Sequence, residues 1–249
     1  MLIAHDTNGL PVEAARDLPA GVFSCPACDG WMLLKRGRVM VPHFAHMPGT
    51  ECWSEAESVS HLRSKNLLAE KFRQLGYDVQ LEETYRDQGR RVDVAVTIPA
   101  GHRHSRVAVE VQDSAIDVET MKARTRIDRS LGFIGTLWVF TDKRAKTLLD
   151  VTGADIEVRI PNEMLWVDNR YRQGIFVLDL DAEAVWNIEL VPPHLRINEW
   201  YDGDGDEQSS SYVPRTLRCP IRHAADFTLT STPGRYPNEW AVVFAHRRL

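Results

Sequence analysis

The sequence predicts an α/β protein in three parts: a small N-terminal module, a core of helices and strands, and a β-rich C-terminal region. Cysteines and histidines cluster before residue 54, which is typical of a small metal-binding module. Between residues 54 and 148, the apolar patterns predict a helix, three strands, a helix and a strand. Short apolar runs separated by Pro and Gly fill the rest. We therefore divide the chain into 1–53, 54–148 and 149–249.

The charge of the chain is unevenly distributed. The composition, 43% hydrophobic and 26% charged, is that of a globular protein and excludes wholesale disorder. A net charge of -5 argues against a protein that binds nucleic acid through a uniformly positive surface. However, residues 86–149 carry 12 basic and 8 acidic side chains, whereas the flanking segments are net acidic. This basic middle indicates either local nucleic-acid binding or an ordinary solvated surface.

The sequence contains no membrane or secretion signal that we can identify. No apolar run approaches the roughly 20 residues needed to cross a bilayer. The segment Met1–Gly21 lacks the basic start and apolar core of a secretory signal. We expect a cytoplasmic protein with no membrane partner, in which closely spaced cysteines indicate metal binding or redox chemistry rather than disulfides.

A zinc knuckle is predicted in the N-terminal module. A CxxC pair is followed by two histidines and a third cysteine, at spacings near those of zinc ribbons. Because zinc takes four thiolate or imidazole ligands, we predict a structural Zn²⁺ site with His43 as the alternative histidine and with these ligands: Cys25, Cys28, His46 and Cys52. A redox CxxC is the rival interpretation, although the segment CPAC precedes no long helix.

The first core helix is predicted to begin near Ser54 and to end before Gly76. Ser54 and Glu57 form a capping-box pattern, and Gly76 is a typical residue after a helix end. Alternating apolar residues then predict three strands, the last two antiparallel: Tyr77–Leu81, Arg91–Ile98 and Arg106–Gln112.

The second core helix is predicted from its cap, Asp117, to about Ser130. The next run, Ile134–Phe140, is almost wholly apolar, as in a buried parallel strand. Beyond residue 150, further strands extend the central sheet or form a separate lobe: Ile156–Ile160, Ile175–Leu180, Val185–Val191, Phe227–Thr230 and Trp240–Ala245. The stretch Asp202–Ser211 is predicted as a mobile acidic loop without calcium-loop spacing.

Two carboxylates occupy the predicted polar faces of neighbouring strands. Asp93 and Glu110 face the same side, and Gln112 follows on that side. Adjacent carboxylates repel each other unless a cation lies between them, and oxygen ligands suit Mg²⁺ or Mn²⁺. Such an ion lowers the pKa of bound water and offsets charge on a phosphate undergoing attack. We therefore predict a catalytic Mg²⁺ or Mn²⁺ site at Asp93 and Glu110.

A polar stripe on the first helix is expected to face the same site. Glu57, His61 and Lys65 are spaced by four residues, which places them on one side of a helix. This stripe could contact the metal and a phosphate. Alternatively, each residue is an ordinary member of a helix surface, with Glu57 and Lys65 forming an ion pair.

These motifs together resemble a known family. The order CPAC, VPHFAH, ES-x2-H-x3-K, RVDVAV, AVEVQDSAI and GTLWVF, over roughly residues 20–142, is similar to the competence protein CoiA-like family. That family in turn resembles the PD-(D/E)xK nucleases, which implies a restriction-endonuclease-like αβββαβ core. The resemblance implies a role in DNA processing, in competence or in recombination of incoming single-stranded DNA, with repair or defence in a genome without competence.

The resemblance also assigns roles to residues. Asp93 and Glu110 stand at the two acids of the motif, Glu57 resembles a helical acid of many members, and Gln112 stands where most members have Lys. Gln can orient water but supplies no positive charge. Lys65 or Lys122 could supply it from a helix.

Three functions are compatible with these observations. The first is a metal-dependent endo- or exodeoxyribonuclease that holds DNA, single-stranded DNA included, through backbone contacts from Lys122, Arg124, Arg126 and Arg129. The second is a catalytically silent DNA-binding accessory of recombination with a nuclease-like fold. The third is a protein-binding adaptor that uses the acidic C-terminal third. Recombination or repair proteins are candidate partners, and an oligomer is suggested only by analogy.

Overall fold

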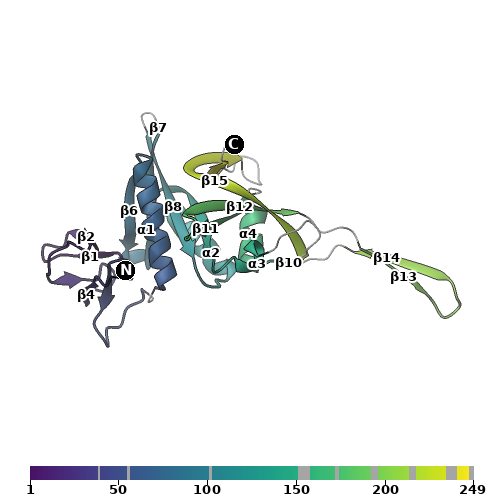
Figure 1. The fold of residues 1–249 in the computed structure, drawn as a ribbon, viewed down its shortest axis with the longest axis horizontal. Coiled ribbons are helices and arrows are strands. Elements are labelled where there is room, and N and C mark those ends of the chain that lie inside the picture. The colour runs from purple at the N-terminus through teal and green to yellow at the C-terminus, as the bar shows by residue number, and fades with distance from the viewer. Residues whose placement is uncertain are drawn as a thin grey trace.

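The structure is a computed structural model of the chain. It describes residues 1–38, 40–54, 57–100, 103–150, 158–171, 174–191, 196–212, 217–233 and 240–246. Within these ranges the protein is mixed α/β, with a small N-terminal sheet, a large central sheet flanked by helices, and a separate β-hairpin. Figure 1 shows the N-terminal module and the hairpin at opposite ends of the central body.

The N-terminal module is a five-stranded antiparallel sheet. The rings of Phe23 and Phe44 form its centre, with centroids 4.9 Å apart. The strands are short because turns interrupt them every few residues. In order across the sheet they are β2 (Pro11–Glu13), β1 (Ile3–His5), β3 (Phe23–Ser24), β4 (Trp31–Lys35) and β5 (His43–His46).

The central sheet contains nine strands within the described ranges. Across the sheet these are β10 (Val158–Arg159), β15 (Leu217–Pro233), β12 (Ala184–Val191), β11 (Ile175–Asp179), β9 (Phe133–Thr141), β8 (Arg103–Gln112), β7 (Arg90–Ala100) and β6 (Asp78–Tyr85), while β16 (Trp240–His246) pairs with β15. The apolar strand β9 runs parallel to both β8 and β11, as its sequence predicted, and the other pairs are antiparallel. The C-terminal strands therefore extend the central sheet.

Helices cover both faces of this sheet. On one face, α1 (Val59–Gln74) buries Leu62, Leu68 and Phe72 against valines of β7 and β8, and β16 lies against the same cluster. On the other face, a second cluster of buried side chains joins β9, β11 and β12 to α2 (Val118–Ser130), α3 (Lys146–Leu149) and α4 (Asn162–Tyr171). None of the described helices is both long and apolar enough to cross a membrane.

The predicted order of helix, three strands, helix and strand is present as α1, β6, β7, β8, α2 and β9. Helix α2 is capped by Asp117, and Gly76 and Gly132 follow α1 and α2 with positive φ angles of 82° and 91°. The predicted start of the first helix at Ser54 is wrong: the helix begins at Val59.

Ser58 is the N-cap of α1, because its hydroxyl accepts a hydrogen bond from the N–H of His61 at 3.0 Å. The same hydroxyl donates to Asp113, which follows β8. Ser54 is used elsewhere, because its hydroxyl accepts a hydrogen bond from Arg91. The capping-box prediction was therefore wrong, because the Ser54 hydroxyl bonds to Arg91 and Ser58 caps the helix instead.

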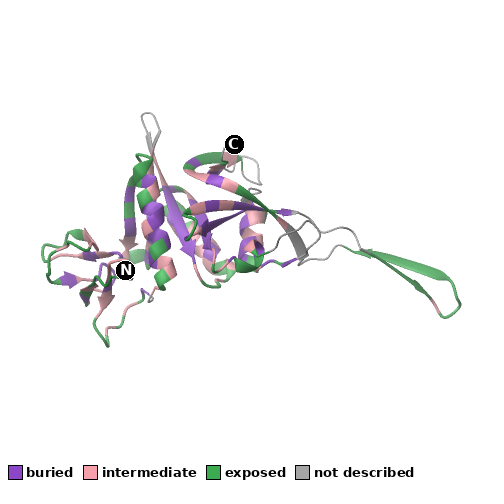
Figure 2. Ribbon diagram, in the orientation of Figure 1, coloured by how far each residue is buried: buried purple, intermediate pink, exposed green. Residues whose placement is uncertain are grey.

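Two further features of the C-terminal region were not predicted. Helix α4 follows β10, which falls within the strand predicted over Ile156–Ile160, and no helix was expected in this region; residues 151–157 lie outside the described ranges. The hairpin of β13 (Arg196–Tyr201) and β14 (Glu207–Tyr212) includes most of the stretch predicted as a mobile acidic loop. Figures 1 and 2 show this hairpin projecting from the body and largely exposed.

Candidate metal centre and carboxylate site

Three cysteines and one histidine meet in the N-terminal module. The Sγ atoms of Cys25 and Cys52 are 4.0 Å apart, and Cys28 Sγ lies 3.5 Å from His46 Nε2. One ligand atom from each of the four residues lies within 4.8 Å of every other. All three cysteines are free of disulfides. His43, the alternative ligand, instead donates its Nδ1–H to the carbonyl oxygen of Val41 at 3.0 Å.

Backbone turns bring these four residues together. The N–H of Asp29 donates to Cys25 O, and the N–H of Cys25 donates to Gly30 O, both at 2.9 Å, so the CxxC segment closes into a tight turn. The thiols of Cys25 and Cys52 each accept a hydrogen bond from the backbone N–H two residues later. Arg86, on the 3₁₀ turn η1 (Arg86–Gln88) after β6, forms an ion pair with Asp29 and thereby fastens this turn to the core.

The geometry of this cluster fits zinc. Tetrahedral zinc with ordinary bond lengths places its ligand atoms roughly 3.5–3.8 Å apart, close to the separations found here. Burial raises the pKa of the Cys25 thiol to about 12, so the thiolate form requires a nearby cation. Four ligands of the thiolate and imidazole type leave no open position, which is the pattern of a structural site.

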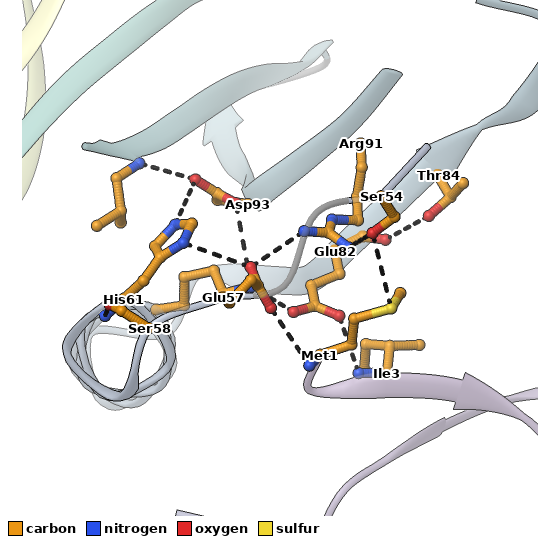
Figure 3. Close-up of polar contacts among 12 residues, drawn as sticks. Met1, Ile3, Ser54, Glu57, Ser58, His61, Glu82, Thr84, Arg91 and Asp93 are labelled. Carbon is orange, nitrogen blue, oxygen red and sulfur yellow. Dashed lines mark hydrogen bonds and ion pairs between the residues drawn. The ribbon is translucent and has the colours of Figure 1, made fainter. Parts of the chain in front are cut away.

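A second group of candidate ligands lies between α1 and β7. Atoms of Glu57, His61 and Asp93 lie within 4.8 Å of one another. His61 Nε2 is 3.1 Å from Asp93 Oδ2, and His61 Nδ1 is 3.5 Å from Glu57 Oε1. Figure 3 shows the imidazole between the two carboxylates. Glu57 lies before the N-cap of α1 and not on the helix as predicted, yet both Glu57 and His61 face Asp93, the first predicted acid of the β-strand pair.

Lys65, the third stripe residue, is wholly buried among carboxylates. Its Nζ contacts Glu57 and Glu82 directly and lies 4.0 Å from Asp93 Oδ1. Arg91 Nη2 lies 3.1 Å from Glu57 Oε1, and the amino group of Met1 is 3.3 Å from Glu57 Oε2. The acids in this site are thus neutralised by cations of the chain itself.

Glu82 is a member of this cluster that the sequence analysis missed. It lies within β6, where the alternating pattern predicted no functional residue, yet its side chain is fully buried. Its φ angle is 51°, an unusual value for a non-glycine residue, and its carboxylate accepts a hydrogen bond from the N–H of Ile3 at 3.1 Å. The local break in the strand turns Glu82 towards Lys65, and no sequence pattern signals such a break.

The electrostatic environment keeps these groups charged. Burial by itself would raise the pKa of Glu57, but Lys65 and Arg91 lower it to about 2. Burial would likewise raise the pKa of Asp93, but His61 and Lys65 lower it. Burial would lower the pKa of His61, but the Asp93 carboxylate raises it overall. The acids are therefore carboxylates, and His61 is the group whose charge changes most readily near neutral pH.

Asp93 and Glu110 are adjacent but contact different helices. The N–H of Asp93 donates to Glu110 Oε1 at 3.2 Å, and the N–H of Val111 donates to Asp93 Oδ2 at 2.9 Å. These side-chain bonds replace the regular β7–β8 pairing, whose register begins at Val94. Asp93 contacts His61 on α1, whereas Glu110 Oε2 lies 3.7 Å from Arg124 on α2.

Glu110 belongs to a buried ion network on the α2 side. Its Oε1 is 2.7 Å from Arg90 Nη2, and Arg90 also pairs with Asp128, which accepts a hydrogen bond from Thr136. Burial raises the pKa of Glu110, and the nearby Asp93 charge raises it further, while Arg90 opposes both effects. On the Glu110 side, the positive charge that we predicted as a metal ion between the two carboxylates is supplied by Arg90.

The remaining predicted residues are divided between two places. Gln112 is buried after Glu110, and its Nε2 donates to Ser114 O at 2.7 Å. Arg124 faces Glu110. The other predicted DNA-binding cations, Lys122, Arg126 and Arg129, line a separate pocket between α2 and α4, so Lys122 lies away from the carboxylate group and Lys65 is the lysine beside Asp93.

Comparisons with known proteins find two family models that match successive parts of the chain. The family model "Competence protein CoiA, N-terminal domain" matches residues 8–55, and "Competence protein CoiA, nuclease-like domain" matches residues 57–155. The chain is similar to Competence protein CoiA of Bacillus subtilis (strain 168), with 31% identity over 126 residues. That match covers 50% of this chain and 32% of the relative. No solved structure matches the chain.

Proposed function

The chain belongs to the CoiA-like family, and from this premise we propose that it is a metal-dependent DNA nuclease that hydrolyses phosphodiester bonds. The observation that carries the proposal is the group formed by Glu57, His61 and Asp93, with Glu110 bonded to the Asp93 backbone. Its setting within the nuclease-like domain supports a role in processing incoming DNA during competence, or in recombination or repair.

The donor set favours manganese over magnesium. Glu57 and Asp93 offer carboxylate oxygens, which suit both ions, whereas His61 offers an imidazole nitrogen, which suits Mn²⁺ better than Mg²⁺. With His61 protonated, three acids (Glu57, Glu82 and Asp93) face Lys65, Arg91 and His61. A divalent cation that displaced the His61 proton would leave the group more positive, which favours a phosphate.

The bound ion would lower the pKa of a water molecule and offset charge on the phosphate. Gln112 is suited to orient that water. The carbonyl oxygen of Ser114 can only accept a hydrogen bond, so the Gln112 amide nitrogen faces it. The amide oxygen of Gln112 is then the group left to accept a hydrogen bond from the water. Lys65 supplies the positive charge that Gln112 lacks. Arg124, beside Glu110, is placed to contact a phosphate on the α2 side.

For the N-terminal module we propose a structural zinc ion bound by three thiolates and one imidazole. The four ligand atoms are already gathered, and the backbone N–H groups of the knuckle point at two of the sulfurs. The zinc would hold the module folded and take no part in the reaction.

A second candidate function is DNA binding without cleavage. It is favoured by the ion pairs that already neutralise the acids: Arg90 on Glu110, and Lys65 on Glu57 and Glu82. Such a site holds together without a divalent cation, and Gln112 replaces the lysine that the motif normally provides.

Cleavage of single-stranded and duplex DNA, measured on zinc-loaded protein with and without added Mn²⁺ or Mg²⁺, tests the proposal. We expect Mn²⁺-dependent cleavage that Asp93→Asn and Glu110→Gln each reduce by roughly 100-fold or more. Glu70→Gln, which changes an exposed acid of α1, is the matched control and should cleave normally. Cleavage that survives both site variants would contradict the nuclease assignment, and binding without cleavage would support the second candidate.

A further inference from the structure

A pocket of about 280 Å³ lies between α2 and α4, separate from the carboxylate group. Its lining combines cations, a hydroxyl and an aromatic ring: Lys122, Thr125, Arg126, Arg129, Trp166 and Arg170. The α4 residues lie beyond residue 155, where the match to the nuclease-like domain ends. The C-terminal region, to which neither family model assigns a role, therefore forms one wall of this pocket.

Helix α2 presents two different basic sides. Lys122, Thr125, Arg126 and Arg129 follow the spacing i, i+3, i+4, i+7, so they form one stripe along the pocket. Arg124 lies outside that stripe and faces Glu110. The opposite wall has the same regularity, since Trp166 and Arg170 are four residues apart on α4. One helix thus links the carboxylate network to the pocket.

At least two of the four cations that line the pocket are not neutralised by the described residues around it. Lys122 pairs at 2.8 Å with Glu119, a largely exposed acid. In the ranges that the structure covers, the side chains of Arg126 and Arg129 form no ion pair or hydrogen bond, and both residues are exposed. Like charges gathered around a cavity repel one another, and an anion that enters the cavity relieves this repulsion.

The half-buried Trp166 narrows the class of anion. It packs against the cluster beneath α4 and also lines the pocket, so an indole surface lies next to the cations. Inorganic phosphate or a carboxylate would use only the cations. A nucleotide uses both, because its phosphate takes the positive charge and its base stacks on an aromatic ring, as in many proteins that bind single strands.

We propose that the α2–α4 pocket holds one nucleotide of a single-stranded DNA, with its phosphate at Lys122, Arg126 and Arg129 and its base on Trp166. Duplex DNA keeps its bases paired and stacked, so the pocket selects single strands or frayed ends. This inference rests on the proposed DNA substrate but does not depend on cleavage. It gives the C-terminal region a role in binding the strand that the carboxylate site would cut.

Binding of a fluorescent single-stranded oligo-dT of about twelve nucleotides tests the pocket. The protein is zinc-loaded, no Mg²⁺ or Mn²⁺ is added, and anisotropy is measured at several salt concentrations. We expect Trp166→Ala to weaken binding roughly 5- to 150-fold, the range for loss of one stacked base. Trp166→Phe should restore most of the affinity and also shows that the fold is intact. Trp31→Ala, at an exposed tryptophan of the N-terminal module, is the matched control.

The phosphate contact has its own readout. The double variant Arg126→Ala/Arg129→Ala should reduce the slope of log affinity against log salt by up to about 0.7, since both arginines contact the same phosphate and each phosphate neutralised on a single strand contributes about 0.7. Arg63→Ala, an exposed arginine on α1, should leave the slope unchanged. Competition by thymidine monophosphate that is lost in Trp166→Ala supports the nucleotide assignment. Equal competition by inorganic phosphate or by an acidic peptide would overturn it.

A parallel cleavage assay separates this inference from the proposed function. If wild-type protein cleaves DNA while the pocket variants bind oligo-dT normally, the pocket assignment is wrong and the nuclease proposal stands. If wild-type protein does not cleave while the pocket variants lose binding, the nucleotide pocket stands and the nuclease proposal fails.

Discussion

The two candidate metal groups differ in how their charges are balanced. In the knuckle, the sulfurs of Cys25 and Cys52 contact each other and backbone N–H groups, and the sulfur of Cys28 contacts His46. In the α1–β7 site, the carboxylates already contact Lys65 and, through Glu57, Arg91. The buried Cys25 thiol, whose pKa is raised, therefore needs an external cation to ionise, whereas Glu57 and Asp93, whose pKa values are lowered, are charged without one.

This difference separates a metal that builds structure from one that serves chemistry. Without the proposed zinc the knuckle keeps only a weak network of sulfur contacts, so its stability would depend on the ion. The carboxylate group is held by buried ion pairs, so the divalent cation that we propose there could enter and leave while the fold persists. An exchangeable metal is what a phosphodiesterase site requires, and a permanent metal is what a small module with little core requires.

The largest expected effect comes from removing a knuckle ligand. His46→Ala should reduce zinc content from about one equivalent to near zero and unfold the N-terminal module, because structural zinc contributes roughly 10–16 kcal/mol of apparent binding free energy. Zinc analysis by mass spectrometry together with circular dichroism measures both outcomes. His43→Ala is the matched control, because His43 bonds to Val41 instead. If His43→Ala lost the zinc and His46→Ala kept it, the ligand assignment would be reversed.

The next largest effect concerns the cation in the carboxylate site. Lys65→Met leaves Glu57 and Glu82 buried without their main partner, which should lower the free energy of unfolding by about 3–5 kcal/mol. Lys71→Met, on the same helix but paired with an exposed glutamate, should change it by about 0–1 kcal/mol. Urea titration compares the two variants. Equal losses would show that the buried lysine does not hold the site together.

A smaller effect is expected from crowding the knuckle. A Cβ atom at Gly30 would lie 2.6 Å from Thr50 Cγ2 and 3.1 Å from Cys28 Sγ, so Gly30→Ala should destabilise the module by about 1–3 kcal/mol and weaken zinc retention. Gly37→Ala meets no atom within 4 Å at its Cβ and serves as the control. Competition with a colorimetric zinc chelator measures retention. Identical retention in both variants would contradict the close packing of the knuckle.

The smallest effect concerns the start of α1, the helix that carries His61 and Lys65. Ser58→Ala removes the cap of His61 N–H and the bond to Asp113, and should lower the free energy of unfolding by about 1 kcal/mol. Ser130→Ala, at the exposed end of α2, should change it by less than about 0.5 kcal/mol. Thermal denaturation distinguishes the two. If Ser54→Ala lowered the free energy of unfolding more than Ser58→Ala does, Ser54 and not Ser58 would be the helix cap, as the sequence predicted.

Local signals predicted the elements and the knuckle well. Asp117, Gly76 and Gly132 end or begin helices through backbone rules that act within a few residues. The four residues predicted to bind zinc do lie together in the structure, in part because the spacing of Cys25 and Cys28 confines these two to one turn. Spacing alone could not decide between His46 and His43. The structure places His46 beside Cys28, whereas His43 bonds to the carbonyl oxygen of Val41.

The carboxylate site was predicted only in part. The alternation of β7 and β8 placed Asp93 and Glu110 on one face, but the side-chain bonds at Asp93 interrupt the strand pairing and turn the two acids to different helices. Glu82 was missed because its contact with Lys65 depends on a single unusual φ angle, which the sequence does not signal. The α4 wall of the basic pocket was missed because its sequence lies in a region expected to be β-rich, in which no helix was predicted.

Hydrogen exchange, compared between zinc-loaded protein and protein stripped of all metal by a chelator, tests the contrast between the two groups most directly. We predict that amides of the knuckle strands β3, β4 and β5 lose protection in the stripped protein, while amides of α1, β7 and β8 keep theirs. Equal loss of protection in both regions, or protection retained in the knuckle, would contradict the account.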